Sequence, residues 1–224
     1  MQMDAVGART RAKWRRRSAT AAMLGVVLYV LIDVVLQFLP PHYSPISDAE
    51  SNLAVGPYGW IMNLNFLGRA VFCVCVVVAI ALTAREREPA QRDGMLQTGL
   101  ALLLIGGASS AVLAFFPTDV IAADTSTLQT STTVGVVHLV FASFGFVTAL
   151  AAVMLLTIWL RVRRVLPRTQ AWASTFAALT LAGLLLVVAS SAWAPGVVGL
   201  AERLALAGIL GWTYAVSAGI RRLV

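Results

Sequence analysis

The stretch YGWIMNLNFLGRAVFCVCVVVAIALT (residues 58–83) decides the class of this protein. It is predominantly apolar and exceeds the roughly 20 residues that a helix needs to cross a hydrocarbon core of about 30 Å. It lacks the short alternating pattern of a membrane barrel strand. The charged sequence REREPAQRD (residues 85–93) follows it directly. The pattern predicts a transmembrane helix with one charged end.

Five similar apolar runs lie on either side of this stretch, near residues 18–39, 95–115, 134–160, 170–192 and 198–220. The 224-residue chain is 59% hydrophobic and 12% charged, which falls outside the usual range of a soluble domain. The sequence therefore predicts an all-α membrane protein. We expect a six-transmembrane-helix bundle over residues 18–220, between a basic tail (residues 1–17) and a short end (residues 221–224).

The basic residues indicate how this bundle crosses the membrane. All but two of the 17 lysines and arginines lie in the tail, the second loop, the fourth loop and the C-terminal end. By the positive-inside rule these segments face the cytosol, so both termini are expected to be cytoplasmic in a multi-pass protein of the cell membrane. The tail is expected to belong to an uncleaved signal anchor. Because topology and anionic lipid account for the basic residues, no nucleic-acid partner is expected.

Cysteine and histidine positions argue against a metal or a disulfide. Cys73 and Cys75 point to nearly opposite faces of a helix, so both are interpreted as packing residues. His42 and His138 are the only histidines, and neither has a zinc-binding spacing to another ligand. A zinc site would need carboxylates from separate loops. We predict no metal and no cofactor.

Two connections on the outward side are long enough to cover a site between helix ends, namely residues 39–60 and 115–135. The first contains prolines that stop the preceding helix, followed by polar residues that predict a short helical turn at the interface. The second is rich in Thr and Ser and has no basic residue. The fifth connection, around residues 193–196, is long enough only for a turn.

Ionisable side chains inside the apolar runs need a partner or a cavity. Asp33 lies about six residues before the end of the first run, and Arg69 lies roughly 16 Å below the membrane boundary. Arginine retains its proton, so we predict an ion pair between Asp33 and Arg69. The pair either fixes helix register or helps to bind a substrate. Asn63, early in the second run, is a further substrate-binding candidate.

A second polar set is expected at the outward ends of the helices. His138 opens the fourth run one loop after Asp119, and imidazole beside a carboxylate can transfer protons near pH 7. We predict that Asp119 and His138 are catalytic, that Glu202 and Arg203 bind substrate, and that Asp119, His138 and Arg203 share one pocket. Carboxylates in such a site should have raised pKa values. The alternative is that His138 caps a helix and that Glu202 pairs with Arg203 at a helix start.

Four segments together resemble a known family: SDAESNLAVGPYGWIMNLNF (residues 47–66), FFPTD (residues 115–119), VHLVFASFGF (residues 137–146) and GLAERLALAGILGW (residues 199–212). The chain resembles the bacterial and archaeal membrane family catalogued as domain of unknown function 998, over about residues 20–220. The resemblance implies six helices and a bacterial inner membrane, and it brings no settled activity. It also adds Asp48 to the substrate-binding candidates. The positions that match the family pattern are Asp48, Asn63, Pro117, Asp119, His138, Gly199, Arg203 and Trp212.

Three functions remain open at this point. The first is an acid/base enzyme with an outward-facing polar pocket that acts on a lipid-like or isoprenoid-like substrate. The second is a small transporter or lipid-binding accessory protein, and the third is a structural membrane subunit. Transport requires polar residues across the whole membrane, whereas here they stop near Arg69. The expected partner is a membrane lipid or a hydrophobic small molecule.

Overall fold

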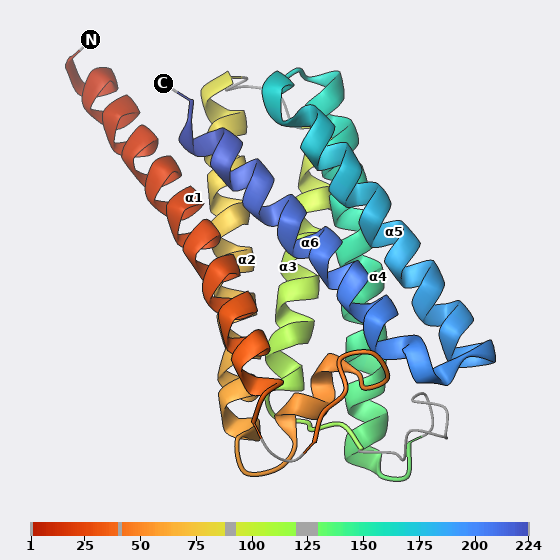
Figure 1. Cartoon of the computed structure of the whole chain (residues 1–224). Helices are drawn as coiled ribbons and strands as arrows, with labels where there is room; N and C mark the ends of the chain where they lie inside the picture. Colours follow the sequence, from red (N-terminus) through yellow and green to blue (C-terminus); the bar gives the residue numbers. More distant parts are fainter. Residues whose placement is uncertain (1, 40–41, 88–92, 120–129, 224) are drawn as a thin grey trace.

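The computed structural model describes residues 2–39, 42–87, 93–119 and 130–223, and its described residues contain helices and no strand. Six helices are long and apolar enough to cross a membrane (Figure 1). The predictions of an all-α fold and of six helices long and apolar enough to cross a membrane are confirmed for the described residues. The helices are α1 (Gln2–Leu36), α2 (Gly59–Arg87), α3 (Gly94–Leu113), α4 (Thr133–Val162), α5 (Gln170–Trp193) and α6 (Val198–Arg221), with short 3-10 turns η1 (Glu50–Ala54), η2 (Pro167–Thr169) and η3 (Pro195–Val197).

Both ends of the chain lie at the same end of the bundle, which we call the termini end (Figure 1). The basic tail expected before residue 18 is the first part of α1, which is continuous from Gln2. Arg15 forms an ion pair with Glu86 on α2 and donates a hydrogen bond to the carbonyl of Leu223 (3.1 Å). These contacts join α1, α2 and the C-terminal residues. That the termini end is cytoplasmic stays a prediction.

The six helices form a closed bundle in which each helix packs against its neighbour in sequence and α6 returns to pack against α1. The helix α6 also contacts α2 and α4, which puts one of its faces inside the bundle. Small residues allow close approach between α5 and α6. A Cβ atom on Gly183 would meet the backbone of Ala205, and one on Gly208 would meet the backbone of Thr180.

The half of the bundle nearer the termini end is tightly packed. Ile80, Leu156 and Trp212 are almost fully buried there, in one hydrophobic cluster. The indole Nε1 of Trp212 donates to Thr157 Oγ1 (2.8 Å), so the one polar atom of this side chain is satisfied. The opposite half, which we call the pocket end, carries η1 and the long connections between α1 and α2 and between α3 and α4 (Figure 1). Residues 120–129 of the expected Thr-rich cover lie outside the described residues.

Substitution of Gly183 by Ala is expected to destabilise the fold, because the new Cβ has no room against the α6 backbone. Overpacking of this kind costs about 1–3 kcal/mol. At about 2–4 °C per kcal/mol for a chain of this size, the melting temperature should fall by several degrees. Gly68→Ala is the matched control, since nothing lies near the Cβ position of Gly68. Equal melting temperatures for the two variants would contradict the close α5–α6 packing.

Candidate functional site

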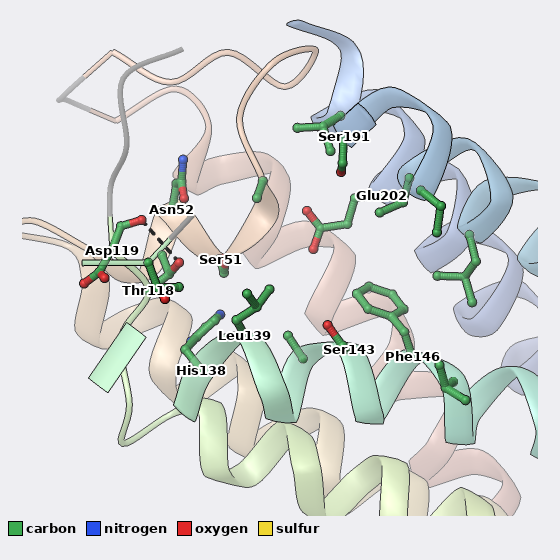
Figure 2. A pocket seen from close by; sticks show the side chains of 18 of the residues that line it. Ser51, Asn52, Thr118, Asp119, His138, Leu139, Ser143, Phe146, Ser191 and Glu202 are labelled. Carbon is green, nitrogen blue, oxygen red and sulfur yellow. Dashed lines mark hydrogen bonds between the residues drawn. The ribbon is translucent and has the colours of Figure 1, made fainter. Parts of the chain in front are cut away.

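A cavity of about 500 Å³ lies at the pocket end, between α4, α5 and α6 and beneath the two long connections (Figure 2). We call it the outer pocket. Its wall is largely apolar, and polar side chains are distributed around it (Figure 2). The polar residues that line it are Ser51, Asn52, Thr118, Asp119, Thr130, His138, Ser143, Ser191 and Glu202.

His138 projects from the first turns of α4 into the outer pocket (Figure 2). It is only 3% exposed. Its Nδ1 lies 2.7 Å from the carbonyl oxygen of Phe116. A carbonyl can only accept, so Nδ1 carries the proton and Nε2 of the neutral ring keeps a free lone pair. The side chain is therefore oriented as a base, with the α3–α4 connection fixing its tautomer.

Glu202 projects from the first turns of α6 into the same pocket (Figure 2). Its Oε2 accepts a hydrogen bond from the backbone N–H of Glu50 (2.9 Å), which satisfies a donor at the start of η1. The helical turn expected in the first connection is thus present and is held by a residue far along the chain. The other oxygen, Oε1, has no hydrogen-bond partner in the part of the chain that the structure describes. Glu202 therefore offers one free acceptor to the pocket.

Glu50 is a carboxylic acid that the sequence did not identify as a site residue. It is 4% exposed, and its Oε2 accepts from the hydroxyl of Tyr29 on α1 (2.9 Å). Burial, with the nearby charges of Asp33 and Glu202, raises the pKa of Glu50 to about 8. The group is therefore mostly protonated at neutral pH. The sequence does not predict this burial, because Glu50 lies in a polar connection that contains several prolines.

A second, smaller cavity of about 20 Å³ separates the outer pocket from Arg69. We call it the inner chamber. His138 and Glu202 line both cavities, and Glu50 and Arg69 line only the inner one. The chamber admits about one water molecule. A third cavity, of about 30 Å³, also touches Arg69 and has almost wholly apolar walls. Polar side chains therefore extend from the outer pocket through the inner chamber to the guanidinium of Arg69.

The predicted ion pair between Asp33 and Arg69 is not formed. The Nε of Arg69 donates to Ser110 Oγ on α3 (2.7 Å), and its guanidinium carbon lies 5.8 Å from the ring centres of Tyr29 and Phe66. Asp33 instead accepts from Gln37 one turn along its own helix (2.7 Å). The rotation of α2 turns Arg69 toward the bundle interior, where the acidic side chains that line the same cavity are Glu50 and Glu202.

Asp119 lines the outer pocket but is held by the start of α4. Its carboxylate accepts hydrogen bonds from the backbone N–H groups of Ser131 (2.8 Å) and Thr132 (2.9 Å) and from Thr132 Oγ1 (2.8 Å). These bonds hold the pKa of Asp119 below its usual value. The expectation of raised carboxylate pKa values is therefore wrong for Asp119. Gly135 lies where a Cβ would collide with this carboxylate.

Arg203 does not line the outer pocket, so the prediction that it shares the pocket with Asp119 and His138 is wrong. Its guanidinium packs over the ring of Tyr43 (5.2 Å to the ring centre) and fastens the first connection to α6. Asp48 also lies outside the pocket, where its Oδ2 accepts from the Ser44 N–H (2.8 Å). Asn63 lines none of the three cavities described above. The groups that accept from Arg203 are the carbonyls of Pro45 (3.1 Å), Asp48 (3.3 Å) and Gly199 (3.1 Å) and the hydroxyl of Tyr43.

The chain matches one known protein family. The family described as protein of unknown function (DUF998) matches residues 23–219. The chain belongs to this family. Searches of the curated proteins and of the solved structures found no match. Of the positions predicted from the sequence to match the family pattern, Asp119 and His138 line the pocket, Asp48, Gly199 and Arg203 fix the first connection, and Trp212 is buried in the core.

Glu50→Gln is expected to change how stability depends on pH. The folded pKa of Glu50 is raised from 4.5 to about 8, so the folded state holds a proton that the unfolded state loses. Stability should therefore fall as pH rises from about 5 to about 8. The groups around Glu50 are Tyr29 and Asp33 on α1, Arg69 on α2 and Glu202 on α6. Glutamine can still accept from Tyr29, so its advantage in melting temperature over wild type should grow across this window. A constant difference across the window would contradict the assignment.

Proposed function

We propose that the chain binds an amphiphilic, lipid-like molecule in the outer pocket and carries out acid–base chemistry on its polar end. The observation that carries this proposal is a cavity of about 500 Å³ with a largely apolar wall and two free acceptors, Nε2 of the buried His138 and Oε1 of the half-buried Glu202. Cavities of about 300–1,000 Å³ with a few convergent polar groups are typical of small-molecule sites.

The apolar side of the pocket supports a lipid-like ligand. Val147 of α4 and Val188 of α5 both line the cavity and are 62% and 70% exposed. A residue that lines a cavity and is also exposed marks a place where the cavity meets the outer surface. In a bilayer this surface of α4 and α5 faces acyl chains. The opening between the two helices thus suits a molecule that moves in sideways from the membrane.

The polar side supports acid–base chemistry. His138 has its tautomer fixed by Phe116, so that Nε2 can take a proton from a bound hydroxyl or ammonium group. Glu202 Oε1 can accept a hydrogen bond from the same group and hold it in place. Glu50, protonated at neutral pH, lines the adjoining inner chamber and can return a proton. A base, an orienting acceptor and an acid therefore come from α4, α6 and η1.

The geometry favours this function over transport and over a purely structural role. The polar set ends at Arg69, and the bundle beyond it is packed around Ile80, Leu156 and Trp212. A transporter needs access from both sides, whereas an enzyme or binding protein needs only one. Polar residues that only join helices pair with each other, whereas His138 Nε2 and Glu202 Oε1 face a cavity.

Ser143→Trp tests the proposal by filling the pocket from α4. Native mass spectrometry of protein released gently from its membrane should detect a bound amphiphile in wild type and none in Ser143→Trp. Val140→Trp is the matched control, because Val140 is exposed on the same helix and does not line the pocket. The amphiphile should remain bound to this control. Equal retention by all three proteins would contradict the proposal.

Lipid profiling of cells distinguishes a catalytic role of the outer pocket from ligand binding without catalysis. Cells that express wild type should accumulate or lose one lipid species relative to cells without the chain. Cells that express His138→Asn at the same level should resemble cells without the chain. If both proteins change the profile equally, His138 is not a base and the site only binds its ligand.

A further inference from the structure

The charges around the outer pocket indicate which head groups a bound amphiphile can carry. We propose that the polar end of the ligand is a hydrogen-bond donor without negative charge, a hydroxyl or an ammonium group, and that phosphate head groups are excluded. The inference rests on the proposed function and specifies which amphiphiles that site accepts.

The described lining of the outer pocket contains two acidic residues, Asp119 and Glu202, and no lysine or arginine. Asp119 is fixed in its ionised form by the N–H groups at the start of α4. Charges interact more strongly where apolar walls exclude water, as at Glu202, than at the exposed rim, where Asp119 lies. A phosphate in this pocket would meet a like charge at the rim with no cation to offset it.

Two free polar atoms of the pocket, on His138 and Glu202, can only accept hydrogen bonds, whereas the serine hydroxyls and Asn52 of the lining can also donate. His138 Nε2 has a lone pair because Nδ1 donates to Phe116. Glu202 Oε1 is a second acceptor, since only Oε2 is used by η1. The His138 side chain is buried, and a buried acceptor is costly when no donor reaches it. A hydroxyl or an ammonium group supplies that donor, whereas a phosphate ester at neutral pH supplies mainly further acceptors.

The two arginines near the site are not available to an anionic head group. Arg203 is engaged by three backbone carbonyls and by Tyr43, outside the pocket. Arg69 lies behind the inner chamber, whose volume of about 20 Å³ admits about one water molecule and no phosphate group. With Glu50 protonated, Arg69 balances Glu202, and the charge of Asp119 remains.

Three amphiphiles with one chain length test the inference: dodecylamine, dodecanol and dodecyl phosphate. The intact protein in phosphatidylcholine nanodiscs is titrated with each, and occupancy is read by native mass spectrometry. We expect the amine and the alcohol to bind at least about tenfold more tightly than the phosphate, which corresponds to about 1.4 kcal/mol. Binding should be lost in Ser143→Trp, which locates it in the outer pocket.

Two isosteric variants test the charge argument. In Glu202→Gln the side-chain oxygen can still accept from the Glu50 N–H, and in Asp119→Asn the carbonyl oxygen can still accept from the start of α4. Both should therefore fold, and the preference for amine over phosphate should shrink severalfold in each. Phosphate binding that equals or exceeds amine binding in wild type, with loss in Ser143→Trp, would overturn the head-group inference and leave the pocket proposal intact. If none of the three binds in a manner sensitive to Ser143→Trp, the proposed function itself fails.

Discussion

His138→Asn is expected to abolish the lipid change caused by wild type while leaving the melting temperature nearly unchanged. The amide nitrogen of Asn reaches the position of Nδ1 and can donate to the Phe116 carbonyl in its place, whereas no atom of Asn reaches the position of Nε2. The variant therefore keeps the contact that holds the α3–α4 connection and loses only the base. Loss of a general base typically costs about 10²–10⁴-fold in rate. Activity on the responsive lipid and thermal melting in detergent are the two measurements.

His138→Ala is the matched comparison for that variant. It removes the base and the donor together, and leaves the Phe116 carbonyl unpaired at a cost of about 1–3 kcal/mol. We expect both variants to be inactive and only the alanine variant to melt at lower temperature. An active His138→Asn protein would contradict the catalytic role. Equal destabilisation of both would show that His138 serves the fold.

Glu202→Ala is expected to lower the melting temperature and to remove the bound amphiphile at the same time. The substitution leaves the backbone N–H of Glu50 without its acceptor, which costs about 1–3 kcal/mol and loosens η1 from α6. It also removes the acceptor that faces the ligand. Glu202→Gln restores an oxygen for η1 and should melt near wild type while its preference among head groups changes. A Glu202→Ala protein as stable as wild type would show that Glu202 does not hold η1.

The number of helices could be predicted from the sequence because each apolar run is long enough for a helix to cross the hydrocarbon core of a bilayer. Because consecutive helices alternate in direction, alternate connections lie at the same end of the bundle. The positions of Asp119 and His138 followed from the same reasoning. Each lies at a helix end on the same side of the bundle, and both line the outer pocket. Topology gives the end of the bundle at which such residues lie but not the direction of their side chains, since Arg203 lies at the same end and does not line the pocket.

The partners of Arg69 and the burial of Glu50 could not be predicted in this way. The spans are apolar on all sides, so their sequences contain little information on which face turns inward. The sequence therefore predicts that Arg69 faces Asp33, whereas the rotation of α2 directs Arg69 toward Ser110. Glu50 is buried because α6 and η1 meet through Glu202, far along the chain. Such contacts depend on how distant helices pack together, and this packing cannot be predicted from a short stretch of sequence.

Photocrosslinking tests most directly whether the outer pocket holds a lipid-like chain. A long-chain amine with a diazirine near the end of its chain is added to membranes that contain the protein, irradiated, and mapped by peptide mass spectrometry. We predict adducts concentrated on the facing pocket residues of α4 and α5 around Val147 and Val188, and their disappearance in Ser143→Trp. Adducts spread evenly over exposed faces such as Val140, and unchanged in Ser143→Trp, would contradict the account.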